Sequence, residues 1–246
     1  MISAINSALS GLAVHSGLVT AAAGNLANLN TTGFKSSRLE LGTLRSMNQG
    51  RNEVGQGAQI LATSRDFSSG VLLGTGSETN LAIQGDGFFK VQRGGEDVYT
   101  RDGSFHLDQD RFLVDAQGNH LQPEVHLPPE ATSVQVDRMG HLTARDAGGN
   151  PVATVDLTLT RFANPNGLES IGQNDFRPTE ASGPPRDFTP GTGGAGALSQ
   201  GVLEASGVDP ALEMVNLMLG QRGFQASIKV LQTADEMLGS VLDIRA

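Results

Sequence analysis

The two ends of this chain carry the same apolar repeat, and the middle lacks it. Near the N-terminus a row with alternating intervals of four and three residues contains the apolar Ile5, Leu9, Leu12, Val19 and Leu26, with Ser16 and Ala23 completing it. Near the C-terminus the same spacing gives Met214, Leu217, Phe224, Ile228, Leu231, Leu238 and Leu242, interrupted by Gln221 and Asp235. Such heptads are typical of the seam of a coiled coil. The sequence therefore predicts two terminal helices that pair with each other and with further copies of the chain.

The first of these segments is unusual because residues 1–34 contain no Asp, Glu, Lys or Arg. Polar residues such as Ser10, His15 and Thr20 interrupt its apolar runs well before the ~18 to 20 residues of a membrane span. It also lacks the basic leading region and compact apolar stretch of a cleavable signal. We therefore expect a helix rich in Ala, Ser and Gly that other helices enclose. The alternative is an ordinary core helix of a monomer.

Between the ends the apolar period changes to two, which predicts short strands. Residues 81–91 indicate two strands around a glycine turn, and Gly94-Gly95 offers a hairpin turn before residues 98–100. Residues 182–197 are so rich in Gly and Pro that we expect an extended return path without regular structure. Asp209 and Pro210 then indicate the N-cap and first turn of the last helix.

These patterns predict an α+β fold, with paired N- and C-terminal coiled-coil helices and a mostly antiparallel β domain in the middle. The expected boundaries are 1–33 and 207–246 for the helical domain, 34–74 and 190–206 for extended connecting segments, and 75–189 for the β-rich domain.

Composition and motifs argue against catalysis and against nucleic-acid binding. The chain has no Cys, which excludes disulfides, zinc thiolate sites and thiol nucleophiles. Its net charge of -9 speaks against a surface that neutralises phosphates. Gly85-Asp86-Gly87 leads into a predicted strand, whereas a dinucleotide site needs a helix N-terminus there. The five histidines show no metal-ligand spacing, so we expect no enzyme, no cofactor and no metal site.

Residues 25–35, Asn-Leu-Ala-Asn-Leu-Asn-Thr-Thr-Gly-Phe-Lys, closely resemble the N-terminal signature of the bacterial flagellar rod and hook proteins. The resemblance continues through residues 81–91, 99–105 and the terminal helix, so it spans nearly the whole chain. Its motif residues are Asn25, Asn28, Thr32, Gly33, Phe34, Lys35, Gly85, Gly87, Phe88 and Phe89. We expect Gly33 to stop the first helix, Phe34 to anchor the exit and Lys35 to be the first solvated group.

Within this family, residues 167–174 and 200–208 are similar to distal rod proteins. Hook proteins resemble the chain at both ends but carry an additional outer domain for which this chain has no room. Two features depart from the distal pattern: the stretch from Arg45 to Gln59 is shorter, and Arg111 stands where the family usually has a turn glycine. A proximal rod protein remains an alternative.

The resemblance implies a structural subunit of the flagellar basal-body rod, exported unfolded and self-assembling into a hollow helical shaft that transmits torque. The implied partners are copies of the chain, proximal rod and hook proteins, the surrounding outer rings and the export apparatus, without nucleic acid or membrane insertion. The apolar residues of the two terminal heptads are the expected assembly interface. Two further alternatives are a hook-type axial protein and a secreted β-domain binding protein.

Overall fold

The computed structural model describes residues 2–44 and 56–243, without the side chains of residues 2 and 241–243. The chain forms two compact units. Unit 1 comprises residues 1–29, 37–65 and 208–246, and unit 2 comprises residues 30–36 and 66–207. Residues 45–55, most of the stretch that we expect to be shorter than in distal rod proteins, lie outside the described residues.

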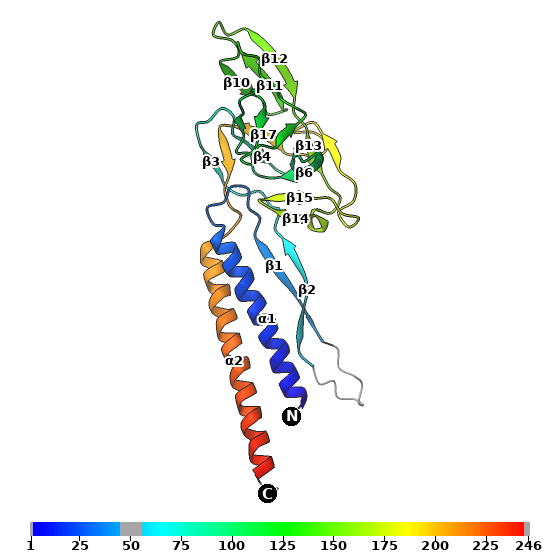
Figure 1. Cartoon of the computed structure of the whole chain (residues 1–246), viewed down its shortest axis with the longest axis vertical. Coiled ribbons are helices and arrows are strands. Elements are labelled where there is room, and N and C mark those ends of the chain that lie inside the picture. Colours follow the sequence, from blue (N-terminus) through cyan, green and yellow to red (C-terminus); the bar gives the residue numbers. More distant parts are fainter. Residues whose placement is uncertain (1, 45–55, 244–246) are drawn as a thin grey trace. The chain divides into compact units, whose positions relative to one another are not determined.

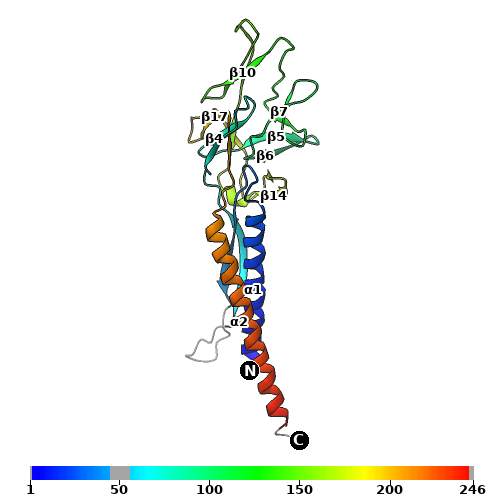
Figure 2. The ribbon, with the colours of Figure 1, turned by 90° about the vertical axis from the view of Figure 1, so that its left-hand side faces the viewer.

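Unit 1 contains two long helices and one β-hairpin. Helix α1 spans Ile2–Ala27 and helix α2 spans Pro210–Asp243. They lie side by side and run in opposite directions (Figures 1 and 2). Strands β1 (Ser37–Thr43) and β2 (Ala58–Arg65) pair antiparallel, and the hairpin contacts α1. The two predicted terminal helices are therefore confirmed, whereas their packing as a coiled coil stays a prediction.

The ends of the helices follow local chemistry. The carboxylate of Asp209 accepts hydrogen bonds from the backbone N–H groups of Ala211 and Leu212, at 2.9 and 3.2 Å, as an N-cap residue does. The expected stop of the first helix at Gly33 is wrong, because α1 already ends at Ala27. Gly33 instead belongs to unit 2 and has a positive φ of 65°.

Unit 2 is built from short strands, and every described pairing is antiparallel. A seven-stranded sheet has the order β14-β15-β6-β5-β9-β8-β7. Its strands are β5 (Phe89–Arg93), β6 (Glu96–Thr100), β7 (His106–Leu107), β8 (Leu113–Val114), β9 (His120–Gln122), β14 (Glu169–Gly172) and β15 (Asp175–Arg177). The mostly antiparallel β domain is therefore confirmed.

The remaining strands of unit 2 form smaller sheets. One has the order β10-β11-β12, and three strand pairs are β13-β16, β17-β4 and β18-β3. Their bounds are β3 (Leu72–Gly74), β4 (Leu81–Gln84), β10 (Ser133–Val136), β11 (His141–Arg145), β12 (Pro151–Asp156), β13 (Leu159–Arg161), β16 (Arg186–Phe188), β17 (Ala197–Gln200) and β18 (Val202–Glu204). A 3-10 turn spans Pro165–Gly167.

Two neighbouring residues of the family motif enter two different cores of unit 2. Phe89 joins the main aliphatic core, which includes Val91 and Leu121. Phe88 joins an aromatic cluster, where its ring contacts Phe162 edge-to-face at 5.7 Å between centroids. This edge-to-face geometry is the one that aromatic rings prefer.

The return path through residues 182–197 contains more regular structure than its composition predicts. Strand β16 within it pairs with β13, so the expectation of no regular structure is wrong there. The segments expected to be extended connections, 34–74 and 190–206, hold the hairpin of unit 1 and the strands β3, β17 and β18. Backbone pairing with a distant segment supplies hydrogen bonds that local composition does not reveal.

Candidate assembly surface

Helices α1 and α2 approach each other through small residues. A Cβ atom added at Gly220 would lie 2.8 Å from Cγ2 of Val19, and one at Gly223 would overlap the ring of His15. The most deeply buried apolar side chains of the helices are also small, namely Ala22 and Ala234, each 2% exposed. Close backbone approach at glycine and alanine therefore defines this contact.

The apolar heptad residues predicted from sequence are only partly covered in a single copy, although Val19 packs against Gly220 at the contact itself. Most of them are half-buried, namely Ile5, Leu12, Val19, Leu26, Leu217, Phe224, Ile228, Leu231 and Leu238. Leu9 and Met214 are exposed, at 57% and 53%, and the side chain of Leu242 lies outside the described part of the chain. In a single copy these residues thus retain apolar surface that a neighbour could cover.

A buried polar cluster joins the three segments of unit 1. The Asn25 amide donates to Oε1 of Glu213 at 2.9 Å and to the carbonyl of Ser37 at 2.9 Å. The Ser37 N–H donates in return to Oδ1 of Asn25 at 2.8 Å. Asn25 is 2% exposed, so an apolar replacement would leave partners unsatisfied. This first residue of the family motif therefore connects α1, α2 and β1.

Sequence reasoning missed the largest apolar side chains that unit 1 exposes on α2. Leu212, Val215 and Leu219 are 49%, 46% and 61% exposed, and Val230 and Met237 are 48% and 46% exposed. For Leu212, Val215 and Leu219 the available signal was a second heptad that runs two residues before the first. Its polar interruptions at Arg222 and Lys229 hid it.

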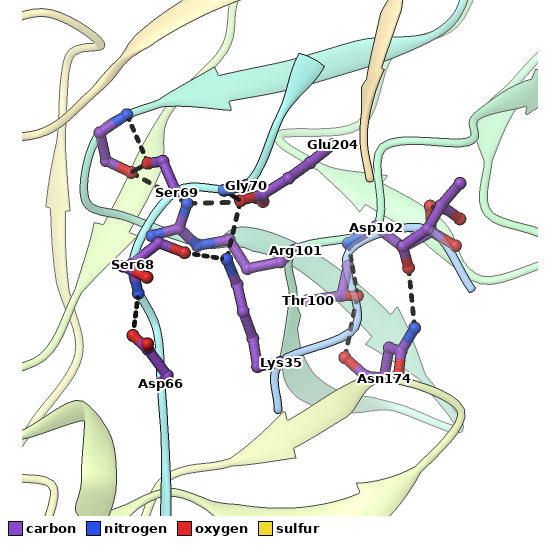
Figure 3. A network of polar contacts seen from close by, with 12 residues as sticks. Lys35, Asp66, Ser68, Ser69, Gly70, Thr100, Arg101, Asp102, Asn174 and Glu204 are labelled. Atoms are coloured by element: carbon purple, nitrogen blue, oxygen red, sulfur yellow. Dashed lines mark hydrogen bonds and ion pairs between the residues drawn. The ribbon is translucent and has the colours of Figure 1, made fainter. Parts of the chain in front are cut away.

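Unit 2 holds a buried ion cluster of two cations and one carboxylate, which Figure 3 shows. Lys35, Arg101 and Glu204 are each 2% exposed. Nζ of Lys35 lies 2.7 Å from Oε1 of Glu204, and Nη1 of Arg101 lies 3.7 Å from Oε2. The expectation that Lys35 is solvated is therefore wrong, because Glu204 compensates its charge.

Backbone groups complete this cluster. The Lys35 ammonium donates to the Ser68 carbonyl at 2.7 Å, and the Gly70 N–H donates to Oε1 of Glu204 at 2.6 Å. Burial lowers the pKa of Lys35, the nearby Arg101 lowers it further, and Glu204 only partly offsets both effects. Burial likewise lowers the pKa of Arg101. Two buried cations therefore depend on one carboxylate.

The neighbouring motif residues are fixed by backbone contacts within unit 2. The N–H of Gly33 donates to the carbonyl of Glu204 at 2.9 Å, and the Thr32 hydroxyl donates to Asp102 at 2.9 Å. A Cβ atom at Gly33 would lie 2.7 Å from the backbone of Arg101. A glycine is required here both by the positive φ and by this close approach.

No described helix is long and apolar enough to cross a membrane, and no group of three or more His, Cys, Asp and Glu in the described ranges could hold a metal ion. One recess of about 440 Å³ in unit 2 is lined by Arg93, Glu96, Val98, Ile171 and Arg177. Its arginines are already engaged, with Arg177 at 3.2 Å from Glu96 and Arg93 at 3.3 Å from Asp175. Its charged groups pair with carboxylates and do not converge on a common centre.

Comparisons with known proteins show the family of this chain. The model of the flagellar hook protein FlgE/F/G D1 domain matches residues 82–144, and that of the flagellar basal body rod FlgEFG protein C-terminal region matches residues 199–244. The flagellar basal-body rod protein FlgG of Borreliella burgdorferi is 38% identical over 97% of each chain. The chain belongs to the flagellar basal-body rod protein family.

Two further rod proteins support the assignment over most of the length. FlgG of Buchnera aphidicola subsp. Schizaphis graminum is 40% identical over 87% of this chain and 88% of its own. FlgG of Bacillus subtilis is 32% identical over the full length of both. As a member of the rod family, this chain is a structural component of the flagellar basal-body rod. The two family models together cover α2 and most strands of the seven-stranded sheet.

The rod-family motif residues fall into both units. Asn25 and Asn28 lie in unit 1, where the Asn28 amide donates to the carbonyl of Gly24 at 2.9 Å. Unit 2 contains the others: Thr32, Gly33, Phe34, Lys35, Gly85, Gly87, Phe88 and Phe89. Gly85 and Gly87 have φ values of 118° and 138°, which favour glycine. The motif therefore serves backbone geometry and buried polar contacts rather than an exposed site.

Proposed function

We propose that this chain is a subunit of the distal rod and self-assembles into the hollow helical shaft that carries torque to the hook and filament. The observation that carries the proposal is the set of apolar side chains that α2 exposes, which no described residue covers: Leu212, Val215, Leu219, Val230 and Met237. Clusters of exposed apolar side chains on a protein commonly mark interaction sites. Because these side chains are already about half-buried, complete burial by a neighbour would contribute about 1 kcal/mol each, roughly half the value for a fully exposed side chain. Copies of the chain are the natural cover for it.

The two terminal heptads form the proposed assembly interface. Their half-buried leucines, and the exposed Leu9 and Met214, still have apolar surface to lose. A charge among them would be buried without a partner in the shaft. A Leu231→Asp variant should therefore be expressed and exported but fail to enter the rod. Normal motility of cells that carry this variant would contradict a role of the C-terminal heptad in assembly.

The proposed partners are further copies of the chain, the proximal rod and hook proteins, the surrounding outer rings and the export apparatus. Membership of the rod family supports assembly of this chain with axial components of the flagellum. The uncharged helix α1 is suited to enclosure by other helices. Coiled-coil packing of the terminal helices is part of this proposal.

Location along the flagellar axis tests the proposal directly. An epitope can be inserted at the exposed turn Gly94-Gly95, where added atoms meet open space. Basal bodies purified from a complemented null strain should retain the tagged protein, and gold labels should lie on the hook-side part of the rod. Labels on the membrane-side part would indicate a proximal rod protein. Protein found free in the medium, with none in basal bodies, would indicate a secreted domain.

A further inference from the structure

Helix α2 carries a second heptad row on a face that no described part of the chain covers. We call this row the outer stripe. All eight of its side chains are exposed: Leu212, Val215, Leu219, Arg222, Ala226, Lys229, Thr233 and Glu236. Residues seven apart return to nearly the same side of a helix, so the stripe is one continuous surface.

The two halves of the outer stripe differ in side-chain size. The first half presents the large Leu212 and Leu219, which form a ridge. The second half has the small Ala226 and Thr233 at the equivalent positions, and these help to line an apolar groove of about 400 Å³. Ala4 of α1 also lines this groove, so both helices shape it. The ridge and the groove lie at different positions along the same helix and cannot touch each other, so the ridge of one copy can only fit the groove of another copy.

The outer stripe also carries three charged residues. Arg222 follows the ridge, Lys229 lines the groove, and Glu236 lies 14 residues after Arg222, next to the groove residue Met237. Neither Arg222 nor Glu236 forms an ion pair among the residues that the structure describes. Packing in register would place Arg222 beside Arg222 and Glu236 beside Glu236, which is repulsive. A shift of 14 residues, two heptads, places opposite charges together.

We propose that α2 of one copy packs along α2 of the next copy in the same direction, with a stagger of 14 residues, or about 21 Å. This pairing rests on the proposed function, because all copies in the proposed helical shaft point in the same direction along its axis. Leu212 then lies against Ala226, Leu219 against Thr233, and Arg222 against Glu236 of the neighbour. Each copy offers a ridge to one neighbour and a groove to another. Such a heterologous contact does not close and therefore generates an open assembly.

Cysteine cross-linking tests the stagger, and the chain has no Cys to interfere. Full-length Leu219→Cys/Thr233→Cys replaces the wild-type protein, and basal bodies are purified and oxidised. A disulfide requires Cα atoms within about 4.4 to 6.8 Å, so only residues that face each other link. The double variant should give a ladder of dimers, trimers and higher species on a non-reducing gel. Each single variant should remain monomeric.

Different outcomes separate the failure of this pairing from the failure of the proposed function. Dimers from Leu219→Cys alone would show packing in register, and dimers from Lys229→Cys alone would show an antiparallel pair; either overturns the stagger. Intact rods that contain the double variant without any ladder would also overturn it. Absence of the wild-type protein from basal bodies would instead refute the rod function itself.

Charge reversal provides an independent readout in the full chain. Arg222→Glu and Glu236→Arg should each raise the protein concentration needed for polymerisation by about tenfold or more, since each brings like charges together. The double reversal should restore assembly to near the wild-type level. Asp235→Arg is the matched control, because this exposed neighbour lies about 100° around the helix. Rescue of Arg222→Glu by Asp235→Arg, or no rescue by Glu236→Arg, would overturn the proposed pairing.

Discussion

The buried ion cluster of unit 2 predicts an asymmetry between two substitutions. Glu204→Gln leaves Lys35 and Arg101 buried without a carboxylate, which should cost about 3 to 5 kcal/mol of unfolding free energy. Lys35→Met removes the bonds to Ser68 and Glu204 but leaves the charge of Arg101 to compensate the carboxylate, so it should cost less, about 2 to 3 kcal/mol. The lowered pKa of Lys35 agrees with this order, because it means that the lysine charge is unfavourable at this position on balance.

Tyrosine fluorescence can measure this asymmetry without separating the units. Tyr99 is the only Tyr of the chain, which has no Trp, and its buried ring packs against Phe162 at 4.9 Å between centroids. Urea unfolding followed by this signal therefore reports on unit 2. With a slope of about 1 to 3 kcal/mol per molar urea, Glu204→Gln should lower the midpoint by about 1 M or more. Equal midpoints for the two variants, or a larger loss for Lys35→Met, would refute the reasoning.

Three further outcomes follow from single residues. Gly223→Ala should weaken the helix pair, because the added methyl group overlaps His15. Gly239→Ala places its methyl group in open space and should gain up to about 1 kcal/mol from helix propensity. Circular dichroism should therefore show opposite shifts of the helix melting temperature for the two variants. Arg111 has φ 63°, so Arg111→Gly should be about 1 to 2 kcal/mol more stable in urea unfolding than Arg111→Ala, and equal stability would contradict this. Burial raises the pKa of Asp175 to about 6. The protonated carboxyl therefore contributes up to about 3 kcal/mol to the free energy of unfolding below pH 4, and this contribution is lost as the pH rises through 6. The melting temperatures of Asp175→Asn at pH 4.5 and pH 7.5 should accordingly differ less than those of the wild type.

The terminal helices could be predicted because heptad spacing is a local property of sequence. The contact between them could not, since it depends on Gly220 and Gly223, which carry no hydrophobic signal. The predicted seam residue Val19 packs against Gly220, but the heptad pattern gives no sign of the glycine opposite it. Apolar spacing therefore indicates a helix and its apolar face, while the smallest residues determine where two backbones approach most closely.

The position of Lys35 shows a second limit of sequence reasoning. Its partner Glu204 is 169 residues away, and the other cation comes from Arg101 on a different segment. A charged residue after an uncharged stretch looks like the first solvated position, because an isolated charge is rarely buried. Only the assembled fold brings the compensating carboxylate into contact. Arg111 is the contrary case, since the family resemblance places it where a turn glycine is usual, and its φ of 63° agrees.

The difference in packing between the two units explains where function resides. In unit 2 large apolar side chains such as Val91, Leu142 and Leu159 are at most 1% exposed, so a single chain completes this core. In unit 1 the fully buried apolar side chains are small or medium, and the long ones remain half-buried or exposed. The proposed function, in which subunits stay separate until export and then polymerise, needs this division. Substitutions in the core of unit 2 should therefore reduce the amount of folded protein, whereas a charge reversal on the outer stripe such as Arg222→Glu should leave the amount unchanged and reduce incorporation into the rod. Immunoblots of whole cells and of purified basal bodies distinguish the two classes, and a stripe variant that is depleted equally from both would contradict this division.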